Sequence, residues 1–215
     1  MILSITIDVF VIIFLFAVFG YLHSILASNR IKRIVIERFG SKIAFYRLFY
    51  NAFALLFFII IYDLMPKPAL MIYDLPYPYD FIVIIPQLLG LAGLIVTSRY
   101  FSLKEFLGIG QIIRWKKGTY NISELDERLT LRIAGPYRYT RHPVYFFFII
   151  FLLFRPAMDL FYLVFLICIV GYFYAGSLYE EKKLRELFGR RYDDYAAHVP
   201  GIIPYKFLYP YKSIQ

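Results

Sequence analysis

The sequence predicts an all-α, polytopic integral membrane protein with about five transmembrane helices, the last two forming a C-terminal helical hairpin. Of its 215 residues, 60% are hydrophobic and only 18% are charged, whereas a soluble domain is about 45–50% apolar and about 25% charged. Long apolar runs recur along the chain, and the basic residues are concentrated between them. A water-soluble monomer is therefore excluded.

The cysteine and histidine content limits the chemistry further. Cys168 is the single cysteine, so an intramolecular disulfide and any site built from several thiolates are excluded. Because the chain has only three histidines, we expect no metal centre.

Three spans are expected in the first part of the chain. Residues 1–27 carry one charge, Asp8, and are long enough to cross a hydrocarbon core of about 30 Å. This run lacks a basic start and exceeds the ~7–15 apolar residues of a signal peptide, so we expect it to remain uncleaved. Residues 44–64 and 81–97 supply the next two spans, and the third contains Pro86, Gly90 and Gly93, which membrane helices tolerate.

The predicted hairpin comprises residues 143–154 and 157–177, with its hinge at Arg155-Pro156. Its first arm is too short to span unaided, so we expect it to tilt inward or to be extended by a snorkelling Arg155. We expect one membrane domain over residues 1–215, in which residues 1–98 form the first three spans. Residues 99–215 then form a long loop, the hairpin and a tail.

The basic residues predict the orientation. Residues 28–47, residues 99–142 and the tail after residue 178 hold 22 of the 24 lysines and arginines. Alternating spans place all three segments on one side, which the positive-inside rule makes cytoplasmic. The N-terminus is then outside and the C-terminus cytoplasmic. The orientation of the chain in the cytoplasmic membrane thus accounts for the net charge of +9. The expected partner is therefore the lipid bilayer and not nucleic acid. The oligomeric state is not predicted.

The long cytoplasmic loop ends in an unusual string, Gly-Pro-Tyr-Arg-Tyr-Thr-Arg-His-Pro-Val-Tyr, at residues 135–145. Pro143 favours an extended conformation for His142 and suits the first position of the next helix. Arg141 and His142 would then lie beside a helix N-terminus, whose free N–H groups favour a carboxylate or a phosphate. The alternative is a simple interfacial stop signal made of the same residue types.

Two adjacent glutamates follow the last span. Glu180 and Glu181 occupy a boundary that normally prefers basic residues, so they need a partner. Pairing with Lys183 or Arg185 on the helix surface is one alternative. The second alternative is that the glutamates and the long loop line one pocket, because both arms of the hairpin are expected to end on the cytoplasmic side. Such a pocket suits a zwitterionic, nucleotide-like ligand such as S-adenosylmethionine, although NADPH also offers anions and ribose hydroxyls.

The two motifs together resemble a known group of enzymes. The string at residues 135–145 is followed by Glu180-Glu181, Leu184, Phe188-Gly189, Tyr192, Tyr195, Val199-Pro200 and Ile203-Pro204. This pattern, over roughly the last third of the chain, resembles the isoprenylcysteine carboxyl methyltransferase and phospholipid methyltransferase superfamily of integral membrane enzymes. The first half is more loosely similar to the NnrU and methanethiol S-methyltransferase-like branch, through His23-Ser24, Tyr46-Arg47-Leu48 and Tyr50-Asn51.

The resemblance implies that a cytoplasmic loop and tail bind S-adenosylmethionine and that a methyl acceptor enters from the bilayer. The acceptor is expected to be a lipophilic or small thiol, amine or carboxylate. The implied cofactor-binding residues are Tyr137, Arg141, His142, Tyr145 and Glu180, and the implied catalytic residues are Glu181 and Arg138.

The sequence departs from the family pattern at two places, and other functions are therefore considered. Phe147 stands where family members often have a small residue, and Ser177, Leu178 and Tyr179 stand where isoprenylcysteine enzymes often have a basic residue. We therefore do not expect a prenylcysteine carboxylate as the acceptor. A membrane NADPH-dependent reductase of the sterol-reductase type, similar in the hairpin region, is the second hypothesis. A non-catalytic member of the fold is the third.

Overall fold

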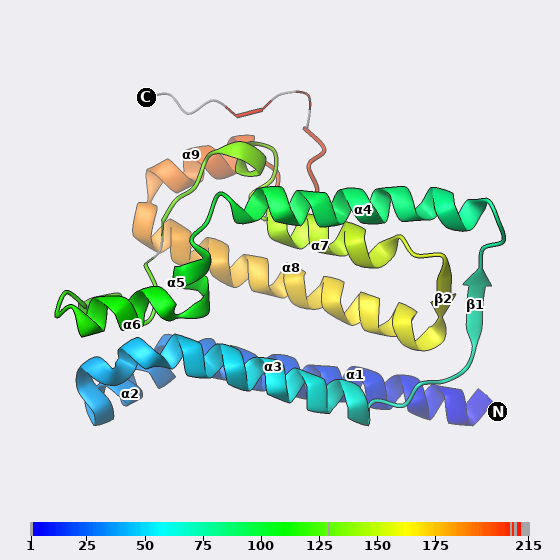
Figure 1. Cartoon of the computed structure of the whole chain (residues 1–215), viewed down its shortest axis with the longest axis horizontal. Coiled ribbons are helices and arrows are strands. Elements are labelled where there is room, and N and C mark those ends of the chain that lie inside the picture. Colours follow the sequence, from blue (N-terminus) through cyan, green and yellow to red (C-terminus); the bar gives the residue numbers. More distant parts are fainter. Residues whose placement is uncertain (1, 129, 207, 209, 212–215) are drawn as a thin grey trace. The chain divides into compact units, whose positions relative to one another are not determined.

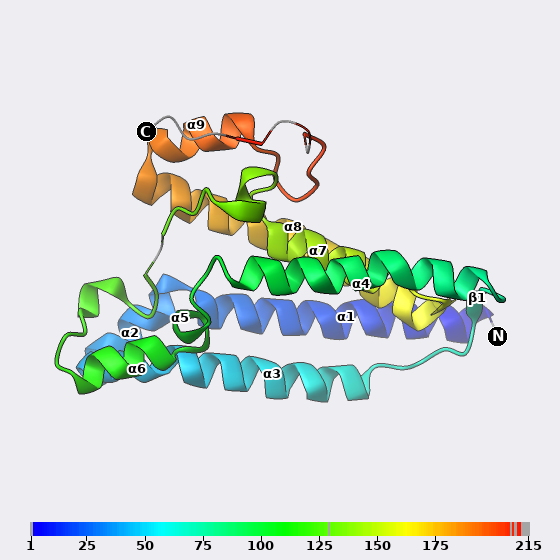
Figure 2. The same ribbon diagram turned by 45° about the horizontal axis from the view of Figure 1, so that its top comes forward.

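The computed structural model describes residues 2–128, 130–206, 208 and 210–211. Helices dominate the fold (Figures 1 and 2). The chain divides into two compact units, Met1–Pro66 with Ser102–Leu129, and Lys67–Phe101 with Thr130–Gln215. Each unit is therefore built from two separate stretches of sequence.

The first unit contains two long apolar helices and the short helices at their ends. They are α1 (Ile2–Ala27), α2 (Asn29–Phe39), a 3₁₀ helix (Gly40–Phe45), α3 (Tyr46–Leu64), α5 (Leu103–Leu107), α6 (Ile109–Lys116) and a second 3₁₀ helix (Ile122–Glu124). Its core cluster consists of Ile43, Tyr46 and Tyr50, against which Ile31, Val35 and Ile36 of α2 pack. In Figures 1 and 2, α2 lies at one end of α1 and α3.

A buried ion cluster joins the loop of this unit to its helices. Lys32 Nζ lies 2.6 Å from Oδ1 of Asp126, and both side chains are almost fully buried. Arg47 reaches Oδ2 of the same carboxylate at 3.2 Å and also pairs with Glu127. The amide of Gln111 donates to the backbone carbonyl of Asp126 at 2.7 Å. Buried charges persist only when paired, so this cluster ties residues 102–128 to α2 and α3.

The second unit contains the hairpin and the tail. Its elements are β1 (Met71–Asp74), α4 (Tyr79–Ser98), a 3₁₀ helix (Gly135–Arg138), α7 (Pro143–Leu153), β2 (Ala157–Asp159), α8 (Leu160–Phe188) and α9 (Arg190–His198). Strands β1 and β2 form a small antiparallel sheet in which Met71 pairs with Asp159. The sequence analysis did not predict this sheet. Strands of three and four residues are too short to show an alternating pattern.

Helix α8 is longer than the predicted second arm of the hairpin. It begins after Asp159, whose carboxylate accepts a hydrogen bond from the N–H of Tyr162 at 2.7 Å. It continues past residue 177 to Phe188 and ends at Gly189, where φ is +53° and only glycine is unstrained. The extension carries Glu180 and Glu181.

Helices α4 and α7 approach each other closely. A Cβ atom at Gly93 would lie 2.2 Å from the ring of Phe147, and one at Gly90 would lie 2.7 Å from the backbone nitrogen of Phe151. The two glycines therefore permit the contact. Phe147, whose size departs from the family pattern, fills the space that Gly93 leaves.

Four helical stretches in the described part of the chain are long and apolar enough to cross a membrane. They are Ile2–Ala27, Asn29–Leu64, Tyr79–Ser98 and Leu160–Phe188. The first, second, third and last predicted spans lie in these stretches or overlap them. Helix α7, at 11 residues, is as short as the sequence predicted for the first arm of the hairpin.

Candidate functional site

The candidate site begins where the loop enters α7. Pro143 is the first residue of this helix, as predicted. His142 before it has φ −123° and ψ 62°, which is outside the helical region but not the extended conformation that was predicted. The backbone N–H of Arg141 donates to the carbonyls of Pro200 and Gly201, at 2.9 and 3.0 Å. The hydroxyl of Thr140 donates to the carbonyl of Ile202 at 2.9 Å. Residues 199–202, called the tail strap below, are thereby held against the motif.

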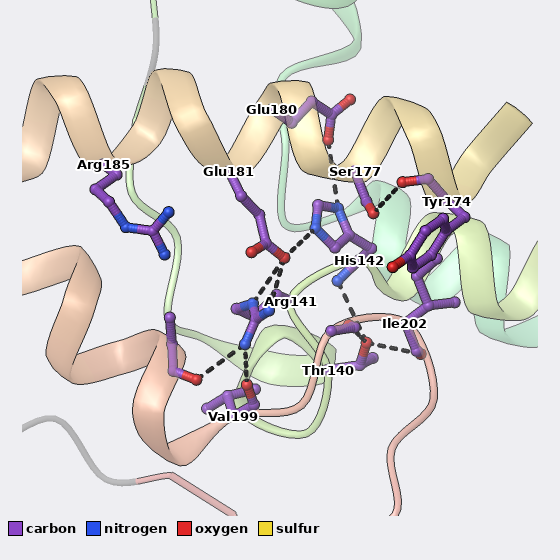
Figure 3. Close-up of polar contacts among 12 residues, drawn as sticks. Thr140, Arg141, His142, Tyr174, Ser177, Glu180, Glu181, Arg185, Val199 and Ile202 are labelled. Carbon is purple, nitrogen blue, oxygen red and sulfur yellow. Dashed lines mark hydrogen bonds and ion pairs between the residues drawn. The ribbon is translucent and has the colours of Figure 1, made fainter.

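His142 lies between the two glutamates of α8 (Figure 3). Its Nε2 is 3.0 Å from Oε1 of Glu181, and its Nδ1 is 3.3 Å from Oε2 of Glu180. Only an imidazolium can donate from both nitrogens. Burial lowers the pKa of His142, but the hydrogen bonds and charges of the two glutamates outweigh this effect and raise the pKa above its ordinary value. The geometry and the raised pKa both favour the protonated form of His142, a buried cation between two carboxylates.

Arg141 connects Glu181 to the tail (Figure 3). Its Nε and Nη2 lie 2.9 and 2.8 Å from Oε1 of Glu181. Its Nη1 donates to the carbonyls of Ala196 and Val199, at 2.9 and 2.6 Å. These contacts engage four of the five N–H groups of a guanidinium, so Arg141 has little donor capacity left for a ligand.

The contacts of Glu181 leave one of its oxygens available. Every hydrogen bond to this carboxylate within the described residues is made to Oε1, by Arg141 and His142. Oε2 accepts none within that same set. Arg185, one of the two alternative partners considered for the glutamates, pairs instead with Asp193 at 2.8 Å.

Tyr145 extends the site with an aromatic stack. Its ring lies parallel to that of His142, with centroids 5.3 Å apart, and parallel to that of Phe173 at 4.6 Å. Its hydroxyl donates to Oε1 of Glu180. Because 54% of the Glu180 side chain is exposed, this carboxylate forms the open side of the site.

The two other predicted site residues have different contacts. The backbone carbonyl of Tyr137 accepts a hydrogen bond from the hydroxyl of Tyr195 at 2.6 Å. Burial raises the pKa of the Tyr137 hydroxyl, and Arg132 opposes that rise. Arg138 donates from Nε to the carbonyl of Tyr211 at 2.7 Å. Of the seven predicted residues, the structure thus gathers Arg141, His142, Tyr145, Glu180 and Glu181 into one network, and Arg138 bonds to the tail.

Sequence reasoning missed Thr140, Phe173 and the strap carbonyls. Thr140 lies within the motif string, but its partners are backbone atoms about 60 residues away, which no side-chain pattern predicts. Phe173 is one of 23 phenylalanines in an aromatic-rich chain, so its position carried no signal.

The arrangement can hold a zwitterion that carries hydroxyl groups. The free N–H groups at the start of α7 favour a carboxylate. His142 would add only its charge there, because both of its nitrogens face the glutamates. Glu180 and Oε2 of Glu181 can accept from hydroxyl or ammonium groups. The face of Tyr145 suits a cation or a flat ring.

Comparisons with known proteins bear on this chemistry. No protein-family profile matches the chain. No solved structure matches it either. The chain is 27% identical over 198 residues to methanethiol S-methyltransferase 1 of Bradyrhizobium diazoefficiens, covering 89% of this chain and 65% of that protein.

Two further relatives match over shorter stretches. The methanethiol S-methyltransferase of Crocosphaera subtropica is 29% identical over 127 residues, covering 57% of this chain and 47% of its own. That of Mycobacterium tuberculosis is 26% identical over 118 residues, covering 54% of this chain and 46% of its own. The chain thus spans between about half and two thirds of the length of the curated relatives it matches. By sequence it is a distant homologue of methanethiol S-methyltransferases.

Proposed function

We propose that the chain is a membrane-embedded, S-adenosylmethionine-dependent methyltransferase that acts on a small thiol. The observation that carries the proposal is the network in which Arg141 and His142 of one motif bind Glu181 of the other. Distant homology to methanethiol S-methyltransferases supports both the reaction and the class of acceptor.

The residues of the network fit S-adenosylmethionine. When bound, this cofactor supplies an electrophilic methyl group on a sulfonium. The N–H groups at the start of α7 would hold its carboxylate, beside the charge of His142. Glu180 and Oε2 of Glu181 would accept from its hydroxyl or ammonium groups, and Tyr145 would line its cationic part. Tyr137, half-buried within the motif, would border this pocket.

Arg141 and Arg138 have supporting roles in this proposal. Arg141 supports the carboxylate end by fixing Glu181 and the tail strap, since its own donors are engaged. Arg138 bonds to Tyr211 and so keeps that residue near the motif. Methyl transfer is an in-line displacement, so the chain contributes mainly by aligning the acceptor and excluding water.

The surroundings of the glutamates favour an uncharged acceptor. Ser177, which precedes them by about one helical turn, is buried, and its hydroxyl donates to the carbonyl of Tyr174 at 2.7 Å. Leu178 and Tyr179 follow it. No basic residue therefore stands where a prenylcysteine carboxylate would be held. In the proposed topology the N-terminus is outside and this site faces the cytoplasm.

Calorimetric titration of the purified full chain tests the cofactor assignment. We expect S-adenosylmethionine and S-adenosylhomocysteine to bind and NADPH not to bind. Binding of NADPH alone would support the reductase, and binding of none of the three would support a non-catalytic protein. His142→Ala should weaken binding, whereas His198→Ala, which changes an exposed histidine, should not.

A transfer assay tests the acceptor. Labelled S-adenosylmethionine is supplied with methanethiol, with a small amine or with a small carboxylate of similar size. We expect label in the thioether product only. Transfer to the amine or the carboxylate at the same rate would contradict the thiol assignment without affecting the cofactor assignment.

A further inference from the structure

Helix α2 presents two different faces. Its inner face packs Ile31, Val35 and Ile36 onto the core of the first unit. Lys32 on the same side is 3% exposed and pairs with Asp126. The helix is therefore fixed in orientation by both apolar contacts and a buried ion pair.

The outer face of α2 is basic and partly apolar. Arg30, Arg33, Ile34, Glu37 and Arg38 follow the i, i+3, i+4, i+7, i+8 spacing of a single helical stripe, and all five are exposed. The three arginines form no ion pair with any residue that the structure describes. The stripe therefore carries an excess of positive charge that the described residues do not neutralise.

The short connections of α2 to α1 and α3 restrict which partners this stripe can contact. Ser28 alone separates α2 from α1, and the 3₁₀ helix Gly40–Phe45 alone separates it from α3. Both neighbours lie in stretches long and apolar enough to cross a membrane. A helix joined so closely to two such elements must remain at the level of the lipid headgroups.

We propose that the outer face of α2 binds the headgroups of anionic phospholipids. Arg30, Arg33 and Arg38 would bind headgroup phosphates, because a guanidinium forms bidentate hydrogen bonds with phosphate oxygens. Ile34, which is 46% exposed, would enter the boundary between headgroups and acyl chains. The anionic lipids of a cytoplasmic leaflet supply the matching charge. This proposal is independent of the methyltransferase assignment.

The test measures lipid binding through stability. The full chain is kept in a neutral detergent, and its thermal unfolding is followed while phosphatidylglycerol or phosphatidylcholine of the same acyl chains is added. A lipid that binds the folded protein raises its melting temperature. We expect phosphatidylglycerol to do so and phosphatidylcholine to have a much smaller effect. Inorganic phosphate at the same concentration should have no effect, which separates a lipid surface from free phosphate.

Two triple variants make the test specific. Arg30→Gln/Arg33→Gln/Arg38→Gln should raise the phosphatidylglycerol concentration for half-maximal stabilisation about tenfold or more, given the contribution of each basic residue near an anionic surface. Lys182→Gln/Arg190→Gln/Arg191→Gln removes the same charge from exposed positions in α8 and α9, and its response should equal that of the wild type.

Three outcomes would overturn the proposal. The first is an unchanged response in the α2 variant. The second is an equal loss in both variants, which would indicate a general effect of net charge. The third is stabilisation by inorganic phosphate alone. Should the triple variant fail to fold, the single Arg→Gln variants should each lose part of the response, and Arg→Lys at the same sites should retain most of it.

Discussion

Arg141 and Glu181 meet through one carboxylate oxygen, Oε1, which lies 2.9 Å from Nε and 2.8 Å from Nη2 of the guanidinium. The two residues are 40 positions apart in sequence, and their side chains are only 16% and 12% exposed. His142 donates to the same oxygen. This atom therefore joins the start of α7 to the C-terminal extension of α8.

Arg141→Ala should lower the free energy of unfolding by about 3 kcal/mol, the lower part of the range for breaking a buried ion pair. The change leaves Glu181 without its strongest partner and the carbonyls of Ala196 and Val199 without a donor. Denaturant unfolding in detergent measures the loss. Arg185→Ala is the control, because its pair with Asp193 is more than half exposed and should contribute less than about 1 kcal/mol. Equal losses would show that Arg141 is not an organising residue.

The stability of the site should depend on pH through His142. Since the pKa of this residue is raised in the folded protein, its contribution to stability is complete below the unfolded value of 6.5 and is lost as the pH rises through the folded value. The melting temperature of the wild type should therefore exceed that of His142→Gln by a margin that shrinks as the pH rises above the unfolded value. His198→Gln, at an exposed site, should show no such trend. A margin that grows with pH would contradict a protonated His142.

Close packing of α4 on α7 should make Gly90 intolerant of substitution. Gly90→Ala places a methyl group against the backbone of Phe151 and should destabilise the protein by about 1–3 kcal/mol, as overpacking does. Gly171→Ala is the matched control, because a Cβ there meets nothing within 4 Å. Thermal unfolding of both variants measures the two changes in stability. Equal effects would mean that helix propensity, and not the α4–α7 contact, governs these glycines.

Gly93 and Phe147 should behave as a coupled pair. Gly93→Ala forces the ring of Phe147 to move, whereas Phe147→Leu makes room for the added methyl group. The double variant should therefore lose less stability than the sum of the two single variants. A double-mutant cycle measures this coupling, and strict additivity would contradict the contact.

Asp126 should be essential to the first unit. Asp126→Asn removes the charge that faces Lys32 and Arg47 and leaves a buried ammonium without its carboxylate. We expect a loss of about 3–5 kcal/mol. Asp193→Asn removes an exposed carboxylate and should change the unfolding free energy by less than about 1 kcal/mol. A small effect at Asp126 would indicate that Glu127 alone can hold both cations.

Much of the fold could be predicted because its signals are local. Apolar length identified the long helices, and Pro143 identified the start of α7. The small sheet and the stack of Tyr145 on Phe173 could not be predicted, because they depend on contacts between segments that carry no distinctive composition. The looser of the two resemblances, that to methanethiol S-methyltransferases, is the one that the comparisons support.

By itself the sequence determined the membrane class, the long apolar helices and the two motifs of the candidate site, because hydrophobic length and residue type are properties of the chain. Only the tertiary structure decided which charges meet. Lys32 and Arg30 are two residues apart, yet one is buried against Asp126 and the other is exposed. Glu181 lies close to Arg185 in sequence but pairs with Arg141. Coulomb energy depends on the distance and burial of two groups in space, and a linear sequence specifies neither.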